Sequence, residues 1–186
     1  MRSLRLALAL VALLSVLSAC GGSSYAMRPS STDEPPAAVE GQALVVFVMP
    51  TSGRDTVSIV DELGVYLGQL RGHAWFSRAV APGDHRFYAL EGSSASVVHA
   101  TGLEAGRVYF VRAEDPVFGV QRFLAGGCDA AALTGTHRTE ADPAASQASI
   151  DRQLGNVPQR TLEADGRFER MSEADRTART LVGACP

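Results

Sequence analysis

The segment Ala43–Met49 decides the fold: it reads ALVVFVM and is apolar at every position. A strand with one face in water alternates apolar and polar residues, whereas a strand covered on both faces is apolar throughout. We therefore expect Ala43–Met49 to be a central strand of a sheet that is covered on both sides.

Short β-favouring segments separated by turn residues continue from this strand to Leu124. The further strands that we predict are Thr56–Val60, Gly64–Leu70, Ala74–Val80, His85–Glu91, Ser94–Thr101, Arg107–Ala113 and Val117–Leu124. Many short strands at such even spacing are typical of a sandwich or barrel. The predicted fold is mainly β: an antiparallel β-sandwich of seven or eight strands, formed by residues 42–127.

The remainder, residues 128–186, is more polar, and we predict a short, partly helical C-terminal extension. Asp142-Pro143 can begin a helix over Ala144–Leu154, and Ser172 can cap a second helix that ends near Val182. Asp165-Gly166 favours the tight turn of a β-hairpin. Because apolar and polar residues alternate poorly on either side of it, a hairpin there is only one of two interpretations. Pro82-Gly83 predicts a tight hairpin turn.

The sequence begins with a short basic stretch, Met1–Arg5, followed by the apolar run Leu6–Leu17. A helix of twelve residues rises about 18 Å, well short of the roughly 30 Å of a bilayer's hydrocarbon core. The pattern is typical of a secretory signal peptide over residues 1–19.

The end of this run, Leu17-Ser18-Ala19-Cys20, is similar to the lipobox of bacterial lipoproteins. The resemblance implies cleavage before Cys20, acylation of its thiol and new amine, and anchoring to the membrane by several acyl chains. Gly21, rather than Asp, after the cysteine implies the outer membrane if the cell is Gram-negative. The alternative is an ordinary signal peptide with a chance cysteine. Residues 20–41 are rich in Ser, Pro and Gly and predict a disordered tether.

The charged residues exclude several chemistries. The sequence has 17 Arg, no Lys and 20 acidic residues, so a Schiff-base lysine and a phosphate-loop lysine are excluded. Removal of residues 1–19 takes away two Arg and no acidic residue, and the net charge falls from −3 to −5. With no basic block, we expect no nucleic-acid partner.

Two cysteines remain once Cys20 is acylated, and we predict a disulfide between Cys128 and Cys185. Such a bond would fasten the C-terminal extension to the sandwich. Two free thiols, or pairing with another chain, are the alternatives.

Residues 43–113 resemble a β-sandwich domain of bacterial lipoproteins, which is itself similar to PEGA and carboxypeptidase-regulatory-like domains. The segments that carry the resemblance are Ala43–Val48, Val65–Leu70, Ala74–Ser77, Ala81–His85 and Leu103–Phe110. It implies a β-sandwich and brings no catalytic residues. The sequence departs from the pattern at Leu67-Gly68, where an Asp-Gly turn is usual.

The side chains that could carry chemistry are scattered along the sequence. None of the four histidines has a partner at metal-ligand spacing, so we expect no metal and no cofactor. We expect His85 to bond to the backbone of its own turn. We identify no catalytic residue; an assembly of His85 or His99 with nearby acids is the alternative.

Trp75, Tyr66 and Arg71 are the candidates for a partner-contact surface. Trp75 and Phe76 point to opposite faces of one strand, so Trp75 is exposed if Phe76 enters the core, unless the C-terminal extension covers it. The function that we expect is a lipid-anchored, non-enzymatic envelope protein that binds an envelope protein or a cell-wall partner. An envelope hydrolase and a small-ligand carrier are the alternatives.

Overall fold

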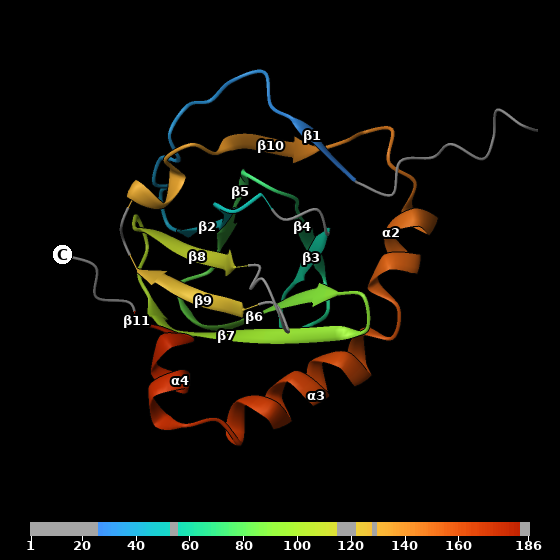
Figure 1. Cartoon of the computed structure of the whole chain (residues 1–186). Coiled ribbons are helices and arrows are strands. Elements are labelled where there is room, and N and C mark those ends of the chain that lie inside the picture. Colours follow the sequence, from blue (N-terminus) through green and yellow to red (C-terminus); the bar gives the residue numbers. More distant parts are fainter. Residues whose placement is uncertain (1–25, 53–55, 115–121, 128–129, 183–186) are drawn as a thin grey trace, which may run out of the picture.

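The computed structural model describes residues 26–52, 56–114, 122–127 and 130–182. Two β-sheets pack face to face, and helices lie against the outer face of one of them (Figure 1). The first sheet has the strand order β1-β10-β5-β2-β8-β9, and the second has the order β11-β7-β6-β3-β4.

The strands of the first sheet are β1 (Met27–Pro29), β2 (Ala43–Met49), β5 (Ala74–Val80), β8 (Val108–Glu114), β9 (Arg122–Gly127) and β10 (His137–Ala141). Those of the second are β3 (Val57–Val60), β4 (Tyr66–Leu70), β6 (Gly83–Glu91), β7 (Ser94–Leu103) and β11 (Thr180–Val182). The predicted strands over residues 43–49 and 74–80 have these bounds in the structure, and the others that it describes differ at their ends. Part of the strand predicted over Val117–Leu124 lies outside the described residues.

Strand β2 is the centre of the first sheet, as predicted. All seven of its residues are buried, and it lies between β5 and β8. Val45 and Phe47 face the core between the sheets, whereas Val46 and Val48 belong to a second cluster on the other side. The continuous apolar run therefore reflects burial on both faces.

The two sheets are mixed, so the predicted all-antiparallel arrangement and the count of seven or eight strands are wrong. β2 runs parallel to β8, β10 parallel to β5, and β11 parallel to β7. The reason is the path of the chain: after β5 it passes through Pro82-Gly83 into the second sheet, and it returns to the first sheet only at β8. Pro82-Gly83 therefore connects the two sheets and forms no hairpin.

Both ends of the described chain join the sheets, which extend beyond the predicted domain of residues 42–127. Met27 of β1, in the predicted tether, is 3% exposed and belongs to the core between the sheets. The backbone N–H of Ala26 donates to the Oε1 of buried Gln69 at 2.6 Å. β10 and β11 come from the predicted C-terminal extension and add one strand to each sheet.

The described residues after β9 contain three α-helices and one 3-10 helix: η2 (Ala130–Leu133), α2 (Gln147–Leu154), α3 (Val157–Glu169) and α4 (Glu173–Ala178). Ser146 caps α2, which begins later than predicted, and Ser172 caps α4, as predicted. α4 stops at Ala178, and residues 180–182 are strand β11. No helix among the described residues is both long and apolar enough to cross a bilayer.

Helix α3 replaces the hairpin that was one reading of Asp165-Gly166. It buries Arg160, Ala164 and Phe168, which lie four residues apart on one face. This stripe packs on the outer face of the second sheet together with Tyr88 and Val97 (Figure 1). Burial of the stripe outweighs the local preference of Asp-Gly for a turn.

Candidate functional site

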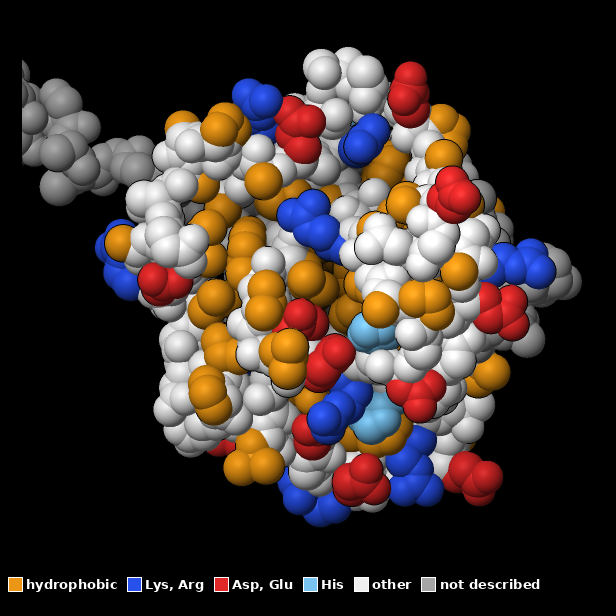
Figure 2. Space-filling view, turned by 180° about the vertical axis from the view of Figure 1, so that it is seen from behind, with side chains coloured by type: hydrophobic (Ala, Val, Ile, Leu, Met, Phe, Trp, Pro, Cys, Tyr) orange, Lys and Arg blue, Asp and Glu red, His pale blue; other side chains and the backbone are white. Residues whose placement is uncertain are grey.

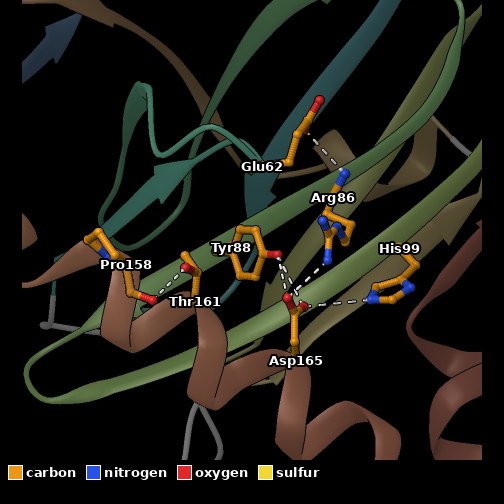
Figure 3. A network of polar contacts seen from close by, with 7 residues as sticks. All are labelled: Glu62, Arg86, Tyr88, His99, Pro158, Thr161 and Asp165. Carbon is orange, nitrogen blue, oxygen red and sulfur yellow. Dashed lines mark hydrogen bonds and ion pairs between the residues drawn. The ribbon is translucent and has the colours of Figure 1, made fainter.

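The candidate site lies where α3 crosses the outer face of β6 and β7. Arg86 and Tyr88 are two residues apart in β6 and share a face, and Arg86 pairs with His99 of β7. Asp165 on α3 lies over these side chains, 79 residues from Arg86 in sequence. We call Asp165, Arg86, Tyr88 and His99 the Asp165 network (Figure 3).

The carboxylate of Asp165 is the centre of this network. Arg86 Nη1 donates to Oδ2 at 3.0 Å, and the Tyr88 hydroxyl lies 3.1 and 3.0 Å from the two oxygens. His99 Nε2 lies 4.0 Å from Oδ1. The network therefore fastens α3 to two strands through one partly exposed side chain.

Burial determines the protonation of two members of the network. Burial raises the pKa of the Tyr88 phenol above its usual range, and the charge of Asp165 raises it further, so the phenol stays a donor. Burial lowers the pKa of His99, an effect that the charge of Asp165 opposes. The His99 ring stacks on Phe168, with the ring centres 3.9 Å apart.

Glu62 brings a second carboxylate to the site from the turn between β3 and β4. The turn is fixed by Asp61, whose Oδ1 accepts the backbone N–H groups of Leu63 and Val65 at 2.9 and 2.8 Å. Glu62 Oε1 lies 3.1 Å from His85 Nδ1, and Oε2 accepts the backbone N–H of Arg86 at 3.3 Å.

His85 contacts the backbone of its own turn, as predicted, because its Nε2 lies 2.8 Å from the carbonyl oxygen of Ala81. Both ring nitrogens therefore face an acceptor, since Nδ1 faces Glu62.

Arg86 and Glu62 line two neighbouring hollows. The first, of about 290 Å³, we call the His85 hollow; it is lined by Glu62, Asp84, His85, Arg86, His99, Ala100 and Thr101. The second, of about 380 Å³, we call the α3 groove; it is lined by Glu62, Leu63, Gly64, Arg86, Tyr88, Val157, Pro158, Thr161, Leu162 and Asp165. Figure 2 shows a face of the molecule on which Arg, acidic and histidine side chains are interspersed, with hydrophobic side chains beside them.

Two leucines on the α3 groove are unusually exposed. Leu63 from the β3–β4 turn is 83% exposed, and Leu162 from α3 is 72% exposed. The groove thus combines apolar side chains from two different elements with the charged groups of Arg86 and Asp165.

The threonine hydroxyl groups of the site are not arranged as activated nucleophiles. Thr161 Oγ1 donates to the Pro158 carbonyl oxygen at 3.1 Å, and Thr101 Oγ1 donates to the Leu181 carbonyl oxygen at 3.4 Å. A nucleophilic hydroxyl donates instead to a neighbouring base. The described residues contain no group of three or more potential metal ligands among His, Cys, Asp and Glu.

The residues predicted for partner contact do not form one surface. Trp75 lies on the outer face of the first sheet and is 3% exposed, while Tyr66 packs with the helix-side cluster of the second sheet. Arg71 is exposed in the turn after β4. Phe76 enters the core, so Trp75 faces away from it, and the C-terminal extension covers its ring.

Residues from β10 and η2 provide this cover. The guanidinium of Arg138 lies 5.6 Å from the centre of the Trp75 ring, and Leu133 packs against the same cluster. Thr139 Oγ1 donates to the Trp75 carbonyl oxygen at 3.1 Å. Cys20, Cys128 and Cys185 lie outside the described residues, so their lipidation and disulfide remain predictions.

Sequence reasoning missed Glu62 and Asp165, the two carboxylates of the site. The local pattern at Asp165 favoured a turn, and no pattern indicated Glu62. No local pattern marks either residue, because their partners are 23 or more residues away. A comparison with known protein families and a search of curated proteins found no match for this chain.

Proposed function

We propose that this protein is a lipid-anchored cell-envelope protein that binds another envelope protein through the α3 groove and has no enzymatic activity. The lipobox-like Leu17–Cys20 supports the anchor. The exposure of Leu63 and Leu162 beside the charged side chains of Arg86 and Asp165 supports the binding of a partner in the α3 groove.

An apolar partner side chain placed between the two leucines would remove both from water. Full burial of a leucine side chain contributes about 1.5–3 kcal/mol, and such anchors, ringed by polar groups, dominate many interfaces. Arg86 and Asp165, with 48% and 26% of their side chains exposed, offer a donor and an acceptor that fix the orientation of the partner.

The proposed anchor would keep this groove near the bilayer. Ala26, whose backbone is held by Gln69, follows Cys20 by six positions in the sequence. Six extended residues span at most about 20 Å. Because Ala26 and Met27 are already buried in the described structure, the tether is shorter than the whole of residues 20–41.

A hydrolase is the weaker reading of the same site. Its carboxylates and histidines lie together, which such an enzyme requires, but Thr101 and Thr161 both donate to backbone carbonyl oxygens. Neither hydroxyl has the hydrogen bond to a base that nucleophilic catalysis needs.

Cross-linking in intact cells tests the proposal. Cells would express the tagged full chain, and co-purifying envelope proteins would be identified by mass spectrometry. Four chains are compared: the natural one, Cys20→Ala, Leu63→Ser with Leu162→Ser, and Val182→Ser. The last is the matched control, since Val182 is 62% exposed and belongs to neither hollow.

The proposal expects one partner with the natural chain and with Val182→Ser, and its loss in the double leucine variant. Cys20→Ala should leave the membrane fraction and lose the partner. A partner retained by the double variant excludes the groove, and membrane retention of Cys20→Ala excludes the lipid anchor.

A further inference from the structure

We propose that the His85 hollow binds a small zwitterion, an amino acid or the free ends of a short peptide, a role beyond partner binding in the α3 groove, with which the hollow shares Glu62 and Arg86. At about 290 Å³ it lies at the small end of the range for ligand sites. Its size therefore suits a ligand of one or two amino-acid residues.

Charged groups of both signs meet in this hollow, and hydrogen bonds within the protein hold each of them. Asp84 Oδ1 accepts the backbone N–H of Gly102 at 2.8 Å, and Glu62 is held by His85 and the backbone of Arg86. The carboxylates are thus oriented before a ligand arrives, which reduces the entropy cost of binding.

Asp84 and Arg86 keep atoms available for a ligand. Asp84 Oδ2 has no hydrogen-bond partner among the residues that the structure describes, and within the same residues Arg86 Nε and Nη2 have none. A carboxylate accepts an ammonium group, while the free edge of a guanidinium matches a carboxylate in a bidentate manner.

The lining of the hollow selects a compact ligand. Asp84 and Arg86 are two residues apart in β6, both are exposed, and both line the hollow. A ligand that contacts both groups within about 290 Å³ carries its two charges close together, as in an amino acid or a dipeptide.

Isotope-edited NMR titration of the chain from residue 20 onward, carrying Cys20→Ala to keep it in solution, tests the proposal. The probes are alanine, alanyl-alanine, N-acetyl-alanyl-alanine and alanyl-alanine amide. Comparison of the affinities for alanine and for alanyl-alanine distinguishes a free amino acid from a peptide as the natural ligand.

We expect alanyl-alanine to shift the Asp84, Arg86 and Thr101 amide resonances saturably in the millimolar range. Removal of either ligand charge should weaken binding about tenfold or more. Equal affinity for the three dipeptide probes, or no saturable shift, overturns the proposal.

Variants of the protein separate recognition of each charge from a general loss of structure. Arg86→Gln removes the partner of the ligand carboxylate, so this variant should bind alanyl-alanine and alanyl-alanine amide equally well. Asp84→Asn removes the partner of the ligand ammonium group, so this variant should bind alanyl-alanine and N-acetyl-alanyl-alanine equally well. Arg71→Gln, in an exposed turn, is the control and should keep the preference for alanyl-alanine over both of these probes. Leu63→Ser with Leu162→Ser should leave the titration unaltered, so failure of this site and failure of the α3 groove are distinguishable. If Arg86→Gln and Asp84→Asn both keep these preferences, the assignment of the two residues to the ligand charges is overturned.

Discussion

The ring of Phe76 in β5 lies directly on the backbone of Gly68 in β4: a Cβ atom at residue 68 would lie 2.7 Å from Phe76 Cζ. The two strands belong to different sheets, so this contact sets how closely the sheets approach at this point. Only glycine leaves room for the ring.

Gly68→Ala is therefore expected to lower the free energy of unfolding by about 1–3 kcal/mol, the usual cost of overpacking a core. Urea denaturation would measure this change. The matched control is Gly166→Ala in the middle of α3, where the nearest atom is the flexible Arg170 Nη1 at 3.4 Å. That substitution should raise stability by about 0.5–1 kcal/mol. A Gly68→Ala protein as stable as the natural one would contradict the close approach.

The Tyr88–Asp165 hydrogen bond is expected to stabilise the docking of α3. Tyr88→Phe should cost about 1 kcal/mol, since the substitution removes the donor and keeps the ring. A double-mutant cycle with Asp165→Ala, which removes the acceptor, should give a coupling energy in the range of about 0.5–3 kcal/mol. Simple additivity of the two substitutions would show that the pair does not interact in solution.

His99 should make stability depend on pH. Burial lowers its pKa in the folded state below the unfolded value of about 6.5, so below that pH the unfolded chain binds more protons. Its contribution is therefore fully present above pH 6.5 and is lost as the pH falls towards the lower pKa. The loss of unfolding free energy between pH 7.5 and 5 should be smaller in His99→Gln than in the natural chain. His73→Gln, at an exposed turn residue, is the control and should keep the natural slope. Identical slopes in all three proteins would rule out this role.

Trp75 is the only tryptophan in the sequence, and its fluorescence reports on its cover. With 3% of the residue exposed, we expect blue-shifted emission and weak quenching by acrylamide. Arg138→Ala removes the cation over the ring and should increase quenching, whereas Arg28→Ala, on the neighbouring strand β1, should not. Strong quenching of the natural chain would mean that β10 does not cover the ring.

The predicted disulfide between Cys128 and Cys185 is open to a chemical test. In a chain isolated from the envelope, neither thiol should react with an alkylating reagent until a reductant is added. A bond that closes this loop would contribute about 4 kcal/mol in the loop-entropy treatment, so reduction should lower the unfolding midpoint. Alkylation without reductant would favour two free thiols.

The local pattern of the sequence was sufficient for most strands and for two helix regions. Ala43–Met49 was identified from its uninterrupted apolar residues, and Ser172 from its capping chemistry. Each signal acts within a few residues, through burial on the faces of a strand or a hydrogen bond to a nearby backbone N–H. The short strand β1 gave no such signal, because its three residues alone show no periodicity.

Strand direction and sheet order could not be obtained in this way. Local signals also mislead where tertiary packing outweighs them. The Asp165-Gly166 dipeptide favours a turn, yet this segment is helical because the stripe of Arg160, Ala164 and Phe168 is buried against the second sheet. The free energy gained by that burial depends on the surface that β6 and β7 form. The dipeptide itself contains no information about this surface.

The sequence by itself determined most of the strands between residues 43 and 114 and where α4 begins, and it predicts the signal peptide and the lipidation site at Cys20. The tertiary structure alone decided that β2 runs parallel to β8 and that Glu62, Arg86 and Asp165 meet in one site. The physical reason is the range of the forces involved. Periodicity and capping act between near neighbours in the chain, whereas pairing follows from how the whole chain buries its apolar surface. Arg86 and Asp165 are thus brought together by the packing of α3 on the second sheet.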